Sequence, residues 1–340
     1  DRVPHLWPEA AVERDPEDRP GGAEFGHIRP ERQRSLKAEV LAEALQRFAG
    51  IEQAVDVQAV AGKADGSGWR TRLRLHVTDD GVVGPFAARS HRVIPVETLP
   101  LAVPAIRELV AGRRDSKPGE LSIVAPSTER ARVIGGGGLI RERVGEREFQ
   151  LDEGGFWQVH PAAALTLSEA VQRAVDPSLL EPGAANLDLY GGVGLLAAAL
   201  GDLAGPGLAI TSVESDKRAT ANATANLSEW PRARAETARV ERWLQSAMGG
   251  GKRDREAREK ATVILDPPRS GAGAKVIDAL AATQPAQIVY VACDPAALGR
   301  DVAIFAEHGY ELTAIRAFDL FPMTHPGETA FQIEDYLGWD

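Results

Sequence analysis

The chain has 340 residues, one cysteine and a formal net charge of −10 at pH 7. This length suffices for two domains with separate cores, and no apolar run approaches the ~18 residues that a membrane helix needs. One cysteine excludes an internal disulfide and a cysteine-ligated cluster, and the seven histidines are scattered without metal-ligand spacing. We therefore expect a cytoplasmic protein without a metal site. The acidic balance argues against indiscriminate binding to nucleic acid.

The first 150 residues predict an arm followed by a small β-rich domain. Residues 1–30 are rich in proline and charge and predict a linker or extended arm. Residues 31–49 have helical apolar spacing and end at Gly50, which predicts an amphipathic helix. Residues 69–77 alternate with period two before an Asp-Asp-Gly turn. This pattern predicts a hairpin on which Arg70, Arg72 and Arg74 share one face.

Further strands are predicted at residues 121–124 and 131–134, and a second hairpin at residues 139–151. Residues 31–150 are thus expected to form a small antiparallel domain of the α+β class. Four consecutive glycines at residues 135–138 are not followed by a helical pattern. We interpret them as a flexible turn and not as a phosphate cradle.

Residues 151–340 alternate between strands and helices, which predicts an α/β domain with a parallel, doubly wound, Rossmann-like sheet. Strands are expected at residues 186–190, 208–213, 262–265 and 287–292, with residues 311–318 and 330–333 as a closing antiparallel pair. Residues 246–260 are rich in glycine and charge and predict a mobile loop. Parallel strands end at the edge where open α/β sheets bind their ligands. The residues at those ends are Tyr190, Gly191, Gly192, Glu214, Asp266 and Cys293.

The glycine-rich turn with Gly192 after one predicted strand, and the Glu214 carboxylate at the end of the next, predict a cofactor that contains adenosine. Glycines let the backbone approach a ligand, and a carboxylate about 20 residues later can accept both ribose hydroxyls. The phosphate-binding fingerprint is incomplete, which favours S-adenosylmethionine over a dinucleotide. Each residue also has a plain structural interpretation: Cys293 as a small buried hydrophobe, Asp266 as a turn cap and Glu328 as a solvated loop carboxylate.

Taken together, the motifs resemble the RNA (uracil-C5)-methyltransferase family over residues 150–335, and more loosely over residues 25–110. The motifs are Phe156–Trp157–Gln158–Val159, Asp188 to Gly194, Val213–Glu214, Asp266–Pro267–Pro268–Arg269, Ala292–Cys293–Asp294–Pro295, and Phe321–Pro322 to Glu328–Thr329. The cysteine before Asp-Pro, with a distal glutamate after Phe-Pro, is more specific than a general methyltransferase signature.

The resemblance implies that Cys293 adds to C6 of uracil and that Glu328 removes the C5 proton. It also implies that Gln158, Tyr190 and Glu214 contact S-adenosylmethionine, that Asp266 lies between the cofactor and the base, and that Phe156 packs against the extruded base. The target would be a single-stranded or loop uridine in RNA, converted to 5-methyluridine. Ribosomal RNA is expected in preference to transfer RNA, on the likeness of the central domain.

The chain departs from the family at three places. Gly21, Gly22, Ala23, Leu99 and Pro100 stand where many members have the cysteines of an iron–sulfur cluster, so no cluster is expected. Leu195 replaces a polar cofactor contact. The family's N-terminal RNA-binding β-barrel is absent from these residues. Either it lies upstream of Asp1, or Arg70 and Arg72 help to bind the RNA. A methyltransferase on another base or on a protein side chain, and a non-catalytic RNA-binding assembly factor, remain alternatives.

Overall fold

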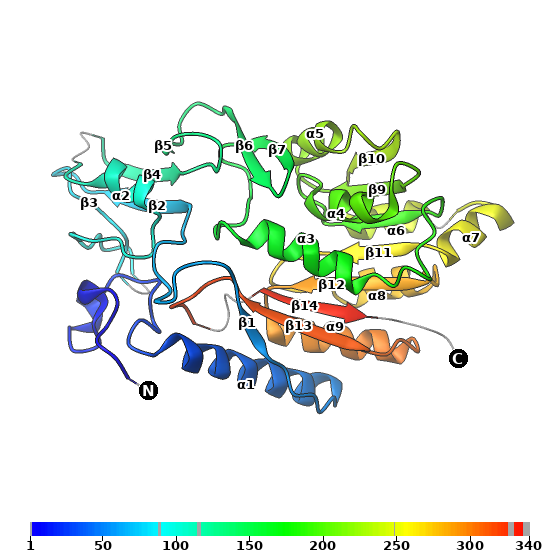
Figure 1. Cartoon of the computed structure of the whole chain (residues 1–340), viewed down its shortest axis with the longest axis horizontal. Coiled ribbons are helices and arrows are strands. Elements are labelled where there is room, and N and C mark those ends of the chain that lie inside the picture. Colours follow the sequence, from blue (N-terminus) through cyan, green and yellow to red (C-terminus); the bar gives the residue numbers. More distant parts are fainter. Residues whose placement is uncertain (1, 88–89, 114–116, 248, 326–329, 336–340) are drawn as a thin grey trace.

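Two sheets of different size organise the chain, whose computed structural model describes residues 2–87, 90–113, 117–247, 249–325 and 330–335 (Figure 1). The large sheet has the strand order β1-β13-β14-β12-β11-β8-β9-β10. Their bounds are β1 Val57–Ala59, β13 Ala314–Asp319, β14 Ala330–Asp335, β12 Gln287–Ala292, β11 Thr262–Leu265, β8 Asn186–Leu189, β9 Ala209–Glu214 and β10 Arg232–Thr237. Strand β14 is antiparallel to both neighbours, and the other pairs are parallel. The predicted doubly wound sheet is confirmed, and its order reverses between β8 and β11.

Helices cover both faces of the large sheet because the central strands are apolar on both sides. Val263 and Leu265 of β11 pack into one core cluster, and Ile264 between them packs into the other. One face is covered by α3 (Ala163–Ala174) and α4 (Leu195–Ala204). The other face is covered by α1 (Pro30–Ala49), α6 (Val240–Ala247), α8 (Ala274–Ala281) and α9 (Pro295–Glu307). Alternate residues of one strand thus point to opposite helical layers, as expected of a buried parallel sheet.

The smaller sheet has the order β3-β2-β4-β5 and lies at the left in Figure 1. Its strands are β3 Val83–Gly84, β2 Arg72–Val77, β4 Gly119–Val124 and β5 Arg132–Val133, and α2 (Pro104–Val110) contributes the buried Ile106. A separate hairpin pairs β6 (Leu139–Val144) with β7 (Arg147–Asp152). Both predicted hairpins are confirmed. The third core cluster joins this sheet to Trp7 and Ala23 of the first thirty residues and to Met323.

Some elements differ from the sequence predictions. The first thirty residues include the short 3₁₀ helices Pro8–Ala10 and Pro16–Asp18 and bury Trp7 against the small sheet. The prediction of a mobile loop at residues 246–260 is wrong in its second half, which forms α7 (Lys252–Glu259). This helix forms because Arg, Glu and Ala favour helix and because the Gly251 N–H donates to the Asp254 carboxylate. Helix α1 packs on the large sheet and strand β1 pairs with β13 at the edge of that sheet, although both precede residue 150. The domain boundaries at residues 30 and 150 stay predictions.

Candidate active site

Cys293 follows the carboxyl end of β12 and precedes Asp294, the N-cap of α9. Its thiol is partly buried, and the Asp294 side chain caps α9 by accepting a hydrogen bond of 2.7 Å from the Ala297 N–H. Burial raises the pKa of the Cys293 thiol, the charge of Asp266 raises it further, and the charge of Arg269 lowers it. The thiol therefore lies within the electrostatic reach of the loop that follows β11.

The loop from Asp266 to Gly273 is fixed at both ends. The Asp266 N–H donates to the Leu189 carbonyl at 3.1 Å, which ties its start to β8. At its end, the N–H groups of Ala272 and Gly273 donate to the buried Asp301 carboxylate at 2.6 and 3.2 Å. The Tyr290 hydroxyl also donates to Asp301, at 2.5 Å. Asp301 thus joins this loop to β12 and to the helix behind Cys293, a role that the sequence did not indicate.

The glycine-rich turn after β8 approaches β9 closely. Tyr190 has a φ of 63°, a left-handed conformation that is unusual for a residue with a side chain. A Cβ at Gly191 would lie 2.0 Å from Ser212 Oγ and 2.5 Å from Asp188 Oδ2, so only glycine fits there. The Gly192 N–H donates to Glu214 Oε2 at 3.2 Å, and a Cβ at Gly192 would meet nothing within 4 Å. The turn therefore brings Gly192 and Glu214 together beside open space.

Two carboxyl groups beneath this turn have strongly raised pKa values. Burial raises the pKa of Asp188 to about 7, and the charge of Glu214 adds to the effect. Burial, with the charge of Asp188, also raises the pKa of Asp266 to about 7. Ser212 Oγ donates to Asp188 Oδ2 at 3.0 Å. The reversal point of the sheet is thus a poorly solvated region where neutral and ionised carboxyl groups coexist near neutral pH.

Among the predicted substrate residues, Arg72 is the first residue of β2 and Arg70 lies just before it, whereas Phe156 lies in the segment between β7 and α3. Phe156 is 78% exposed, whereas Gln158 is half-buried two residues later. Arg72 Nη1 donates to the carbonyls of Glu153 and Gly155 at 3.2 and 2.7 Å, so this guanidinium contacts the backbone of the loop before Phe156. The Arg70 guanidinium lies over the Trp69 ring, 5.4 Å from the centroid.

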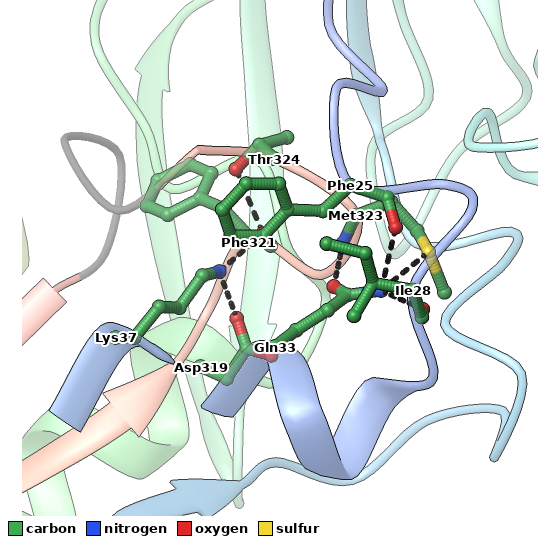
Figure 2. Close-up of polar contacts among 8 residues, drawn as sticks. All are labelled: Phe25, Ile28, Gln33, Lys37, Asp319, Phe321, Met323 and Thr324. Atoms are coloured by element: carbon green, nitrogen blue, oxygen red, sulfur yellow. Dashed lines mark hydrogen bonds and ion pairs between the residues drawn. The ribbon is translucent and has the colours of Figure 1, made fainter. Parts of the chain in front are cut away.

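The segment after β13 is held by polar side chains of α1 (Figure 2). The buried Lys37 Nζ forms an ion pair of 2.7 Å with Asp319 and donates to the Phe321 carbonyl at 2.9 Å. One turn earlier, Gln33 accepts from the Met323 N–H at 2.8 Å. Because β13 is antiparallel to β14, and β14 to β12, Asp319 lies on the same edge of the sheet as Cys293.

The predicted base Glu328 lies outside the described residues. The strand that follows it begins at Ala330, and the second residue of that strand, Phe331, pairs with Ala292 beside Cys293. In the described part of the chain, no group of three or more His, Cys, Asp or Glu side chains has the arrangement of a metal site. No described helix is long and apolar enough to cross a membrane.

Comparison with known proteins identifies the family. The model of the tRNA (uracil-5-)-methyltransferase family matches residues 150–335, which is more than half of the chain. The chain belongs to this family. It is therefore an S-adenosylmethionine-dependent methyltransferase of the RNA uracil-C5 class.

Relatives and a solved structure agree with this assignment. An uncharacterized RNA methyltransferase of Streptomyces avermitilis is 36% identical over 92% of this chain and 80% of its own. One from Streptomyces coelicolor is also 36% identical, over 89% and 74%. The fold matches the tRNA (uracil-54, C5)-methyltransferase of Pyrococcus abyssi, solved with S-adenosyl-L-homocysteine, with a TM-score of 0.68 at 20% identity. The match covers 95% of this chain and 87% of that one.

Proposed function

We propose that this chain methylates C5 of a uridine in RNA through a covalent adduct of Cys293 with C6 of the base. The observation that carries the proposal is the position of the only cysteine, partly exposed at the carboxyl end of β12, next to β11 in the large sheet, and within electrostatic reach of Asp266 and Arg269. The substrate is proposed to be ribosomal RNA in preference to transfer RNA, on the likeness of the central domain to the family.

The glycine turn and Glu214 fit S-adenosylmethionine. No atom would lie within 4 Å of a Cβ at Gly192, so a ligand can approach the backbone there, and the adjacent Glu214 carboxylate can accept hydrogen bonds from ribose hydroxyls. Tyr190 and Gln158 are proposed to contact the remainder of the cofactor, with Asp266 between the cofactor and the uracil. When bound, the cofactor supplies an electrophilic methyl group.

The uracil ring needs activation because C5 is too weak a nucleophile to take a methyl group directly. The Cys293 thiolate adds to C6, which makes the S–C6 bond and moves the double-bond electrons toward C5 and the C4 carbonyl. C5 can then attack the methyl carbon that bound S-adenosylmethionine would supply, forming the C5–methyl bond while the electron pair of the methyl–sulfur bond would leave with the sulfur. Because the pKa of the thiol is raised, the reactive thiolate fraction increases as pH rises above neutrality, and Arg269 favours the thiolate.

Glu328 is proposed to remove the C5 proton, so that the electrons of the C5–H bond re-form the double bond and the S–C6 bond breaks. Two observations on its described neighbours support this role. Lys37 and Gln33 hold the segment that leads toward it on the Cys293 edge, and the ladder after it pairs Phe331 with Ala292. The uracil itself must be unstacked, at a cost of a few kcal/mol that is smallest in a loop.

The deciding experiment is mass spectrometry of the protein incubated with 5-fluorouridine-substituted RNA and S-adenosylmethionine. Fluorine cannot leave C5 as a proton does, so the adduct is trapped. We expect a methylated RNA cross-link on the peptide that contains Cys293, formed faster at pH 9 than at pH 7. Parallel arms with ribosomal and transfer RNA test the substrate preference.

Two control variants make the outcome interpretable. Cys293→Ala should give no cross-link, and Glu328→Gln should still form the adduct with ordinary RNA but release it slowly. A protein that binds the cofactor and methylates RNA without any Cys293 adduct would overturn the proposed mechanism. Binding of RNA without methylation of any RNA tested would instead favour the non-catalytic alternative.

A further inference from the structure

The four glycines at residues 135–138 form a cradle that is filled by a carboxylate of the chain itself. Glu153 Oε1 accepts hydrogen bonds from the N–H groups of Gly135, Gly136 and Gly137 at 3.2, 2.9 and 2.9 Å. Glu153 Oε2 lies 3.4 Å from Arg132 Nε. Converging backbone N–H groups bind anions, and here they lower the pKa of Glu153 to about 2. These hydrogen bonds tie residues 135–137 to the end of β7, and the flexibility of the turn stays a prediction.

The loop that begins at Glu153 is anchored at every second residue by the small sheet and its surroundings. Arg72 binds the carbonyls of Glu153 and Gly155. Trp157 is buried with its ring centroid 5.8 Å from that of Phe149, and the Val159 carbonyl accepts from the Thr71 N–H at 2.9 Å. The anchored positions 153, 155, 157 and 159 leave little freedom to the residues between them.

Phe156 is the residue that these anchors hold out into solvent. At 78% exposure it is the most exposed of the large hydrophobic side chains among the described residues. An aromatic ring on an anchored backbone is prepared to stack on a nucleobase at the cost of its own side-chain freedom, with little further loss of backbone freedom.

We propose that Glu153, through the glycine cradle, is a positioning residue that holds Phe156 as a stacking platform for an unpaired base of the RNA substrate. The inference rests on the proposed function, because it takes RNA as the ligand. In this proposal Arg72 also supports the loop before Phe156, through its hydrogen bonds to the backbone, and does not contact RNA phosphate. Glu153 itself acts only through Phe156.

A double-mutant cycle on RNA binding tests this inference. The variants Glu153→Gln, Phe156→Ala and their combination are measured in a Cys293→Ala background, by fluorescence anisotropy with labelled oligouridine. Phe156→Ala should weaken binding about tenfold, the order of magnitude of one stacked base. Glu153→Gln should weaken it about threefold. The combined variant should bind no more weakly than Phe156→Ala, because positioning by Glu153 has no effect once the Phe156 ring is removed.

Controls separate positioning from a purely structural role. Glu148→Gln, in strand β7 that ends one residue before Glu153, removes an exposed carboxylate that pairs with Arg141 and Arg143, and it should leave RNA binding unchanged. Gly137→Ala provides a second way to disturb the hydrogen bonds to Glu153, because the φ of +68° at this position disfavours alanine. S-adenosylmethionine affinity should stay the same in all these variants, which shows that the large sheet is intact.

The outcomes for this inference and for the proposed function are distinct. Independent, multiplying effects of Glu153→Gln and Phe156→Ala, or no effect of Glu153→Gln, would overturn the positioning role even if the Cys293 adduct forms. A non-additive cycle would support it even if Cys293 forms no adduct.

Discussion

Two glycine-rich turns of this chain look alike in sequence but work differently. In residues 135–138, three N–H groups converge on Glu153, so the chain itself supplies the anion. In residues 191–194, one N–H donates to Glu214, whose other oxygen is held by Ser215 and Asp216, and open space remains beside Gly192. The first turn connects β5 to β6. The second follows β8, where the strand order of the large sheet reverses. We therefore propose that position in the fold, and not glycine content, decides whether such a turn supports a neighbouring loop or binds a ligand.

The largest expected effect is that of Gly191→Ala. The new methyl group would collide with Ser212 Oγ and Asp188 Oδ2, so the turn must move away from the ligand. We expect S-adenosylmethionine affinity to fall at least about 100-fold, the loss that follows from displacing several contacts of about 1 kcal/mol each. Isothermal titration calorimetry measures this, with circular dichroism to check the fold. Affinity within twofold of the parent would contradict the placement of the cofactor at this turn.

A smaller loss is expected for Glu214→Gln. An amide keeps the size of the side chain but accepts hydrogen bonds less strongly than a carboxylate, which corresponds to roughly 1.5 kcal/mol or about tenfold in cofactor affinity. The matched control is Glu307→Gln at the exposed end of α9. Equal affinities for the two variants would remove Glu214 from the cofactor site.

The filled cradle predicts an acid-dependent stability. The pKa of Glu153 is lower in the folded chain, about 2, than its ordinary value of 4.5. Its stabilising contribution is therefore complete above about pH 4.5 and is lost as pH falls toward 2. Relative to Glu153→Gln, the parent should have a free energy of unfolding higher by about 1 kcal/mol at pH 6. Urea titrations should show this difference shrinking at pH 3. A difference that is independent of pH would mean that the carboxylate charge does not matter.

The smallest effects distinguish neighbouring glycines within the cradle. A Cβ at Gly136 would meet only Glu153 Oε1, at 4.0 Å, so Gly136→Ala should change the free energy of unfolding by less than about 0.5 kcal/mol. Gly137→Ala, at a φ of +68°, should cost about 1 kcal/mol. Thermal unfolding of the two variants compares them directly. Equal values would show that the cradle tolerates rearrangement.

The sequence was most informative where local pattern and topology agree. Short apolar strands that stop on Gly, Glu, Asp-Pro or Cys predicted the ends at Tyr190, Glu214, Asp266 and Cys293, because the carboxyl edge of a parallel sheet collects such residues. Strand β10 was missed because Arg and Ala alternate in it without an apolar run, as suits an edge strand.

The hydrogen bonds of the buried carboxylates Asp301 and Glu153 were less predictable because their partners are far apart in sequence. Asp301 binds N–H groups 28 and 29 residues away, and Glu153 binds N–H groups 16 to 18 residues away. Neither separation follows a helical or strand period. The role of Glu328 stays a prediction, as do the roles of the other site residues.

The buried pair of Lys37 and Asp319 also has a consequence for how the chain reaches its fold. Its two members are separated by 282 residues, so α1 cannot bury its ammonium group beside a counter-charge until the end of the chain has been made. A lysine without that partner would be strongly disfavoured in the core. We therefore expect α1 to dock late in folding, after the central strands have formed. Contacts of such high sequence separation slow folding, and ribosome-bound chains that end before residue 319 should leave α1 open to proteolysis.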